Sequence, residues 1–316
     1  MKYFIGPMSK NVVDAIIEFD GDFGFIPSRR QVDYNGGYVN EWTTGEFATY
    51  VNGRVIIQRD HGGIGQGYKY DDGIQSLMYD CRYFDKIHID PWKEYQDFDK
   101  GLQETIDCIN FVHLQVGQQK KIKFEVGTEE SIRRFEVDEL EKLLRHLKRR
   151  LESEIFDNIE YVVVQSGVGL DLGKQNNSGI FEPDRLEKMI DVCRKFGKKS
   201  KEHNGDYLSN DEYKVRFDMG LDSINIAPEF GQLETMIYLN HMDSESISKW
   251  YELCLKSKRW EKWVDEYFIP QDNKRELIEI CGHYLFSDNG FKKIKPDIDT
   301  EIVLEIKYKL GELYKG

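Results

Sequence analysis

Residues 54–63, with the sequence RVIIQRDHGG, join a short apolar run to a polar, glycine-rich end, and this combination recurs along the chain. Short runs rich in Val, Ile, Phe or Tyr that end in polar residues or glycine are typical of buried parallel strands. We predict seven such strands, at residues 3–6, 23–27, 54–58, 86–90, 121–126, 161–165 and 223–227. The polar segment 198–202 is taken as an eighth strand because of its spacing from its neighbours.

Amphipathic stretches lie between these runs and predict helices at 12–19, 139–151 and 183–196. Eight strands that alternate with helices predict an α/β fold, the (β/α)8 TIM barrel. The alternative is a doubly wound sheet, which needs a G-x-G-x-x-G turn after the first strand. The segment Gly6-Pro7-Met8 does not provide that turn, so we favour the barrel.

The sequence changes in character after about residue 240, where helical patterns replace the alternation. We expect helices at 246–267, 276–286 and 301–313, with a turn at 287–290. The predicted organisation is therefore a barrel at 1–240 and a helical C-terminal extension at 241–316 that packs on the barrel. The extension could also serve as a lid or as an oligomer surface.

The composition limits the functional classes. The 316 residues include 44 basic and 57 acidic side chains, a net charge of −13, and 40% are apolar, which excludes a disordered chain. No apolar run of eighteen residues predicts a membrane helix, and the five cysteines form no C-x-x-C pair, so we expect a reduced cytoplasmic protein without a signal peptide. The acidic balance argues against nucleic-acid binding but permits an anionic small molecule in a locally positive pocket.

Hydrophilic side chains follow the predicted strands, where the site of a barrel enzyme lies. The pair Asp60-His61 is the strongest local indication of a metal site, because imidazole and carboxylate groups are common ligands for zinc-like ions. The metal-ligand candidates that can converge at one mouth are His61, His203, Asp90 and Glu125 or Glu129. The alternative is that Asp60 and His61 form a structural hydrogen-bonded pair.

Other conspicuous residues have simpler expected roles. His88 points the same way as Asp90 and is expected to be a core histidine beneath the site. The basic run Lys198-Lys199-Lys201 is expected to be solvated, and the tryptophans at 250, 260 and 263 are expected to be core residues. The basic residues near strand ends can hold an anion or can be rim residues: Arg29, Arg30, Lys93 and Lys174.

Several strand-end stretches occur together in an order that is similar to a known family. They are residues 31–32 with 35–38, 60–63, 86–90, 126–129, 163–165 with 167–168, and 203 with 206–207. Over roughly residues 1–240 the chain resembles the class II aldolase superfamily, most closely the large, so-called non-catalytic, subunit of tagatose-1,6-bisphosphate aldolase. The segment 225–229, Asn-Ile-Ala-Pro-Glu, is similar to the last-strand Asn motif of the catalytic class II aldolases.

The resemblance implies a (β/α)8 barrel, a sugar or sugar-phosphate substrate and a divalent metal, most simply zinc. It implies an acid/base role for Asp60, zinc ligation by His61 and His203, secondary metal positions at Asp90 and Glu125, a hydrogen bond from Asn225 to the enediolate, and phosphate-binding loops at Gly167 and Gly205. Among the strand-end residues we also take Glu129 as catalytic and Arg29, Gln31 and Gln165 as substrate contacts.

Two departures from the family pattern leave alternatives open. The third zinc histidine of catalytic members, after the sixth strand, is replaced by Gln165-Ser166-Gly167, and the phosphate loop reads Asn204-Gly205-Asp206, whose carboxylate repels phosphate. We expect a metal-dependent enzyme that acts on a ketose or ketose phosphate by aldol cleavage or C4 epimerisation. The alternatives are a non-catalytic partner subunit that stabilises a separate aldolase, and a barrel enzyme of cell-surface sugar biosynthesis; a homo-oligomer is also open.

Overall fold

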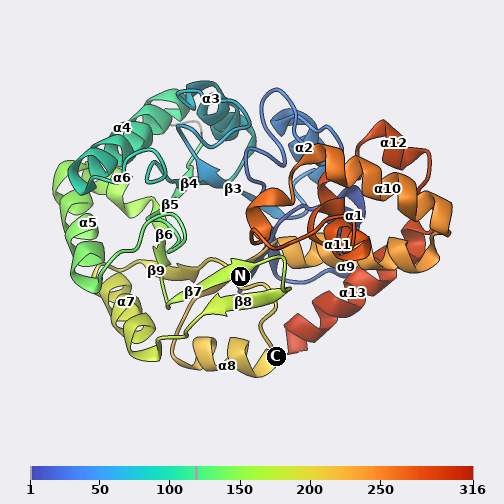
Figure 1. The fold of residues 1–316 in the computed structure, drawn as a ribbon. Helices are drawn as coiled ribbons and strands as arrows, with labels where there is room; N and C mark the ends of the chain where they lie inside the picture. The colour runs from blue at the N-terminus through green and yellow to red at the C-terminus, as the bar shows by residue number, and fades with distance from the viewer. Residues whose placement is uncertain (1, 118–119, 316) are drawn as a thin grey trace.

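The computed structural model describes residues 2–117 and 120–315, and its centre is a closed barrel of parallel strands in the order β1-β10-β9-β6-β5-β4-β3-β2 (Figure 1). The barrel strands are β1 (Tyr3–Ile5), β2 (Phe23–Phe25), β3 (Ile56–Gly62), β4 (Lys86–Ile89), β5 (Lys123–Val126), β6 (Ile159–Val164), β9 (Lys199–Glu202) and β10 (Ser223–Ile226). The predicted (β/α)8 fold is confirmed, and all eight predicted strands, including the polar one, are present.

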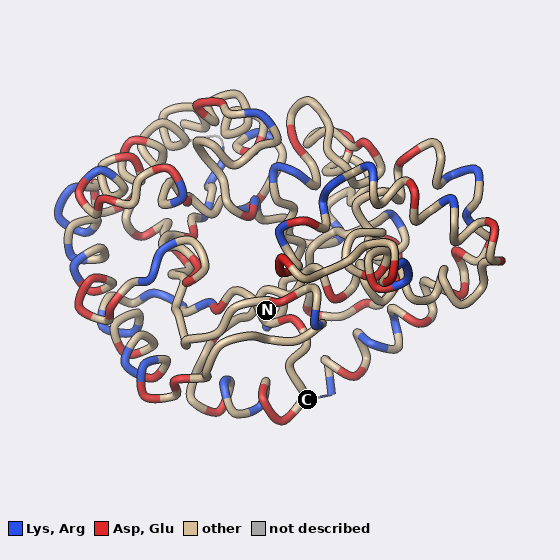
Figure 2. The backbone as a smooth tube through the Cα atoms, in the orientation of Figure 1, with Lys and Arg blue, Asp and Glu red and all other residues tan. Residues whose placement is uncertain are grey.

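Helices surround this barrel (Figure 1). They are α1 (Lys10–Phe19), α2 (Thr44–Val51), α3 (Ile74–Tyr83), α4 (Phe98–Val116), α5 (Val137–Arg150), the short α6 (Ser153–Asp157), α7 (Pro183–Lys195), α8 (Asn210–Asp218) and α9 (Pro228–His241). In α5, the leucines at 140, 143, 144 and 147 recur at helical spacing and are buried, while basic side chains occupy the last turn. Figure 2 shows acidic and basic positions interspersed around these outer helices.

A small antiparallel hairpin follows β6 and was not expected from the sequence. Its strands are β7 (Val168–Asp171) and β8 (Asn176–Gly179), which pair with each other and not with the barrel. The second strand, Asn-Asn-Ser-Gly, contains no apolar residue, so hydrophobic patterning has nothing to detect. The hairpin lies over the mouth of the barrel in Figure 1.

The C-terminal region is helical but more broken than predicted. It contains α10 (Ser244–Ser257), η1 (Glu261–Trp263), α11 (Lys274–Cys281), η2 (Gly282–Leu285), α12 (Asn289–Lys292) and α13 (Asp299–Lys315). The predicted single helix at 246–267 is wrong, because Lys258 adopts a left-handed conformation, with φ of 56°, that ends α10. The predicted turn at 287–290 is in part helical, since Asp288 caps α12.

The C-terminal helices lie together on one side of the barrel, and α13 packs along α1 and α9 (Figure 1). Trp250 is fully buried there, as expected of a core residue. The division into parts at residue 240 stays a prediction, and its outer ends, residues 1 and 316, lie outside the described residues. No helix in the described chain is long and apolar enough to span a membrane.

The barrel interior is filled in layers that place the site above a charged network. Phe4, Ile26 and Tyr161 form a small apolar cluster of their own. The ammonium of Lys201 lies 3.6 Å from the centroid of the Phe4 ring, and it donates to Gln58 at 2.9 Å. The expectation that Lys201 is solvated is wrong: its side chain is fully buried, because it belongs to the inward-facing set of β9.

Candidate metal centre and substrate cavity

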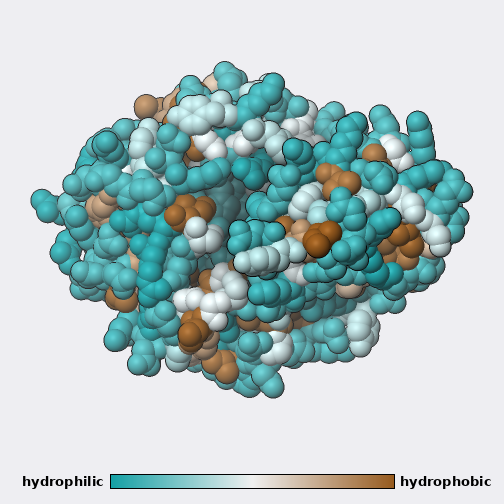
Figure 3. Space-filling view, viewed as in Figure 1, coloured by the Kyte–Doolittle hydropathy of each residue, from teal (hydrophilic) through white to brown (hydrophobic). Residues whose placement is uncertain are grey.

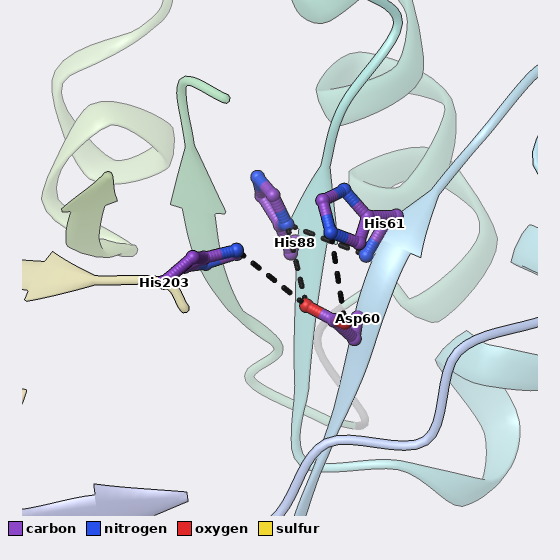
Figure 4. Close-up of side chains that lie close together, drawn as sticks. All are labelled: Asp60, His61, His88 and His203. Atoms are coloured by element: carbon purple, nitrogen blue, oxygen red, sulfur yellow. Dashed lines mark hydrogen bonds and ion pairs between the residues drawn. The ribbon is translucent and has the colours of Figure 1, made fainter. Parts of the chain in front are cut away.

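Four side chains meet at the C-terminal end of the barrel: Asp60 and His61 from β3, His88 from β4, and His203, which follows β9 (Figure 4). Each contributes one candidate ligand atom, and these atoms all lie within 4.8 Å of one another. Three imidazoles and a carboxylate at this spacing can hold one divalent ion. Oδ1 of Asp60 is buried and has no hydrogen-bond partner, as expected of an atom that faces a ligand position.

The backbone explains how two adjacent residues face the same site. In a regular strand, Asp60 and His61 would point to opposite sides. The pairing of β3 with β4 shifts register between Arg59 and Gly62, and His61 has a positive φ of 45°. This irregularity turns both side chains toward the mouth.

One nitrogen of each imidazole is held by a protein acceptor. Nδ1 of His61 lies 2.5 Å from Oδ2 of Asp90, and Nε2 of His203 lies 2.6 Å from Oε1 of Glu125. Nε2 of His88 donates to a backbone carbonyl, that of residue 127, at 3.0 Å. Partners of this kind fix the tautomer and orientation of metal-binding histidines.

The remaining nitrogens face Asp60. Nε2 of His61 is 3.6 Å from Oδ2, while Nδ1 of His88 and Nδ1 of His203 are 3.9 Å and 4.0 Å from Oδ1. Nδ1 of His88 also accepts a long hydrogen bond, 3.3 Å, from the backbone N–H of His61. The three nitrogens therefore lie close to the carboxylate and to one another, and that of His88 is also engaged by a backbone N–H.

The electrostatics of the cluster favour a cation. Burial raises the pKa of Asp60, but the neighbouring imidazoles, His61 first, outweigh burial and lower it to about 2. Burial lowers the pKa of His61, but Asp60 and Asp90 outweigh it and raise it to about 10. The carboxylates therefore stay ionised, and in the absence of a metal the imidazolium protons balance their negative charge. A bound divalent ion would supply this positive charge in place of the protons.

Solved structures that share this fold include proteins named as sugar-processing enzymes. A probable tagatose 6 phosphate kinase from Sinorhizobium meliloti 1021 has a TM-score of 0.73 at 13% identity, over 99% of both chains. The fructuronate-tagaturonate epimerase UxaE from Cohnella laeviribosi has a TM-score of 0.65 at 9% identity, over 99% of this chain and 81% of that one. The YdjI aldolase from Escherichia coli K12 has a TM-score of 0.51 at 14% identity, over 93% and 89%.

The chain has the fold of these aldolase and epimerase structures. The suspected resemblance to the aldolase superfamily is thereby confirmed at the level of the fold. No family model matches the chain, and no curated protein sequence matches it significantly.

A cavity of about 660 Å³ opens above the histidine cluster, and Asp60, His61 and His203 lie in its lining. Figure 3 shows the corresponding face hollowed near its centre and surrounded mostly by hydrophilic side chains. Its volume is in the range of small-molecule sites. Three further predicted residues line it: Gln31, Glu129 and Asn225. Both polar atoms of the Asn225 side chain are buried without a partner, so they are available to a bound molecule.

Two of the predicted metal ligands lie behind the histidines. Asp90 and Glu125 are fully buried, do not line the cavity, and each engages an imidazole. Their assigned role as direct ligands is corrected to one of orientation, because their nearest oxygens are already bonded to ring nitrogens. Glu125 also accepts from Lys201 at 2.8 Å, and nearby positive charge holds its pKa well below its usual range despite burial.

Arg29 and Gln165 do not contact the cavity, contrary to expectation. The buried guanidinium of Arg29 pairs with Asp33 and Asp71 and holds the loop after β3. Both ends of the Gln165 amide are used: Oε1 accepts from the backbone N–H of residue 135, and Nε2 donates to two carbonyls. These side chains are structural because their hydrogen-bonding groups are already satisfied.

The two glycines predicted to grip phosphate are also outside the cavity lining. The N–H of Gly167 donates to Oε2 of Glu130 at 2.9 Å, and the N–H of Gly205 donates to the carbonyl of Asn225 at 2.9 Å. Neither amide is free to bind an anion. A side chain at Gly205 would meet Ile224 at 2.1 Å, so this glycine is needed for close packing.

Sequence reasoning missed three contributions to the site. His88 is fully buried beneath the cavity, as predicted of a core histidine, but its membership of the four-residue cluster was not predicted. Lys201 gave no signal, since it lies in a polar run. The segment 258–263 enters the cavity lining from the C-terminal region, and only the break after α10 brings it there.

Proposed function

We propose that this chain is a metal-dependent enzyme of the aldolase type that acts on a ketose or ketose phosphate, by aldol cleavage or by C4 epimerisation. The observation that carries the proposal is the convergence of three oriented imidazoles on Asp60, whose Oδ1 has no partner, at the floor of a cavity. The aldolase and epimerase fold neighbours support the reaction class.

The residues that would hold the ion are His61, His88 and His203, through Nε2, Nδ1 and Nδ1. A divalent metal, most simply zinc, polarises a substrate carbonyl and its adjacent hydroxyl when bound. In this proposal His88 would supply the third imidazole in place of the histidine that the sixth strand lacks, and its Nδ1 would give up the long hydrogen bond from the backbone N–H of His61.

Asp60 is the acid/base of the proposed reaction. Its carboxylate is ionised at neutral pH, and in the proposed reaction it takes the proton from the substrate hydroxyl next to the carbon–carbon bond that breaks. Asn225 would donate to the oxygen that becomes negative, a role supported by its amide, which has no hydrogen-bond partner in the described protein. Glu129, also in the lining, is the second candidate for proton transfer. Each general acid or base is worth about 100- to 10,000-fold in rate.

A bisphosphate is disfavoured as substrate. Oδ1 of Asp206 accepts from the backbone N–H groups of Ala227 and Glu229, at 3.0 and 2.8 Å, and so occupies the N-terminus of α9. A helix N-terminus is otherwise an anion site, and here the protein's own carboxylate fills it. The substrate therefore has at most one strongly anionic end.

The test is a screen of the purified protein loaded with Zn²⁺ or Mn²⁺ against ketoses, ketose phosphates and uronates, with detection of epimers and cleavage products. Asp60→Ala should abolish turnover without altering the fold, whereas Asp191→Ala, an exposed site on α7, should leave it unchanged. Full turnover by Asp60→Ala would disprove the assignment. Absence of both metal binding and turnover would favour the non-catalytic partner subunit, and turnover of only a modified or nucleotide-linked sugar would favour cell-surface sugar biosynthesis.

A further inference from the structure

Five basic side chains line the cavity above the metal centre: Arg30, Lys93, Lys258, Arg259 and Lys262. Three of them come from the segment that follows α10, and two from loops that follow β2 and β4. In the described parts of the chain, no carboxylate oxygen lies within ion-pairing distance of any of these five, although ion pairs are frequent elsewhere on this acidic protein. Figure 2 shows basic positions of the C-terminal region beside the centre of the barrel.

Uncharged neighbours hold these cations in place. Nζ of Lys93 donates to the carbonyl of Gly65 at 3.2 Å, and Nζ of Lys262 lies 4.0 Å from the ring centroid of Trp263. The Arg259 guanidinium lies 5.1–5.4 Å from the rings of three tyrosines, 38, 68 and 284. Such neighbours fix the side chains without placing a carboxylate in direct contact with their charges.

Arg30, Lys93 and Lys262 are close enough to repel one another. Burial, then the charge of Arg30, lowers the pKa of Lys262 to about 8. The same two causes lower the pKa of Lys93. Glu129 offsets part of this repulsion at Lys262, and Asp90 and Glu94 do so at Lys93, but the lowered pKa values show that repulsion and burial prevail. A bound anion would relieve that repulsion.

We propose that Arg30, Lys93 and Lys262 form an anion-binding subsite that takes the single phosphate or carboxylate group of an acidic sugar. The inference deepens the proposed function and rests on it for the carbonyl end of the substrate, which would reach the histidine cluster. It differs from the glycine-loop mode of phosphate binding, since the amides of Gly167 and Gly205 are occupied and Asp206 fills the N-terminus of α9.

The C-terminal extension thereby gains a function in specificity. Lys262 reaches the cavity only because α10 ends at Ser257 and the chain turns back over the barrel mouth. Removing Lys262 should therefore change which substrates bind, without disturbing the metal centre.

The experiment is calorimetric titration of the metal-free protein with inorganic phosphate, galacturonate and the neutral sugar galactose. We expect one of the two anions to bind, and Lys262→Met or Arg30→Met to weaken that binding about 10-fold or more. Lys256→Met, which removes the same charge from the exposed end of α10, is the matched control and should bind like the wild type. Preference for phosphate indicates a sugar phosphate, and preference for galacturonate indicates a sugar acid.

The proposal is overturned if neither anion binds, or if Lys262→Met and Arg30→Met, shown to be folded by circular dichroism, bind both anions as the wild type does. The two proposals can fail separately, because the titration needs no metal and no turnover. Anion binding that depends on Lys262, in a protein that binds no metal, would leave the subsite intact and reject the enzyme. Metal-dependent turnover of neutral ketoses alone would support the enzyme and reject the anion subsite.

Discussion

Nζ of Lys201 lies 2.8 Å from Oε2 of Glu125, and both side chains are fully buried inside the barrel. The other carboxylate oxygen of Glu125 accepts from His203, so the pair stands directly beneath the histidine cluster. A buried ion pair costs much desolvation, and its members are therefore expected to depend on each other.

Lys201→Met should destabilise the metal-free protein by about 3–5 kcal/mol, because it leaves the buried charge of Glu125 without its partner. The free energy of unfolding in urea measures this loss. Lys199→Met removes a half-exposed lysine from the same strand and should cost about 1 kcal/mol or less. The double variant Lys201→Met/Glu125→Gln should recover part of the stability, and equal stability of Lys201→Met and the wild type would contradict the pairing.

His88→Asn, which removes a proposed ligand, should reduce zinc affinity more than the loss of Asp90, which only orients His61. Loss of an orienting partner typically costs about 10- to 100-fold in metal affinity, and we expect that range for Asp90→Asn. Competition with a chromophoric chelator measures both. His241→Asn, at an exposed site in the last turn of α9, should bind zinc normally. Unchanged affinity in His88→Asn would show that carboxylates, and not a third imidazole, complete the ligand set.

Glu234 on α9 should make stability fall as the pH rises from about 4.5 to 7. Burial raises its pKa to about 7, and Asp299 adds to the rise, against the hydrogen bonds that Ser9 and Asn11 donate to it. The folded state therefore binds the proton more tightly than the unfolded state. This contribution is complete below the unfolded pKa and is lost as the pH passes the folded one.

Glu234→Gln removes that titration, so the difference in unfolding free energy between wild type and variant should change by the order of 3 kcal/mol between pH 4.5 and 7.5. Burial likewise raises the pKa of Asp206 to about 7. Because Asp206 is present in both proteins, its contribution cancels in the difference between their unfolding free energies. Parallel stability curves for the two proteins would refute the assignment.

Gly205→Ala should destabilise the protein by about 1–3 kcal/mol, because a Cβ there would meet Ile224 at 2.1 Å and the carbonyl oxygen of Asn225 at 2.9 Å. It should also impair turnover, since Asn225 lines the cavity. Gly311→Ala in α13 is the opposite case: its Cβ makes ordinary contact with Phe19 at 3.8 Å, and it should stabilise the helix by about 0.5–1 kcal/mol. Thermal denaturation separates the two, and a neutral Gly205→Ala would contradict the packing.

The barrel could be predicted from the sequence because each strand carries its own signal. Even the polar segment at 198–202 was found, from its spacing within the alternation. The hairpin of β7 and β8 could not be found, since its second strand has no apolar residue. The end of α10 depends on one left-handed residue, Lys258, which a helical pattern does not reveal.

The candidate site was predicted in part. Asp60, His61 and His203 stand out because ionisable residues follow predicted strands, and they do lie together. Arg29 and Gln165 were assigned to the substrate for the same reason, yet the structure turns both away from the cavity. A residue that follows a predicted strand can be assigned to the C-terminal end of the barrel. The direction in which its side chain points depends on local strand register, which the sequence does not reveal.

The sequence by itself determined the eight-stranded barrel, the end of it that holds the site, and the Asp60-His61 pair, because hydrophobic periodicity and residue order are local properties of the chain. Only the tertiary structure decided that His88 joins the histidines, that Asp90 and Glu125 hold them from behind, and that the segment around Lys262 lies over the same cavity. These relationships join residues far apart in sequence. They depend on strand register, on the bulge at His61 and on the turn after α10, which fix distances that no local pattern encodes.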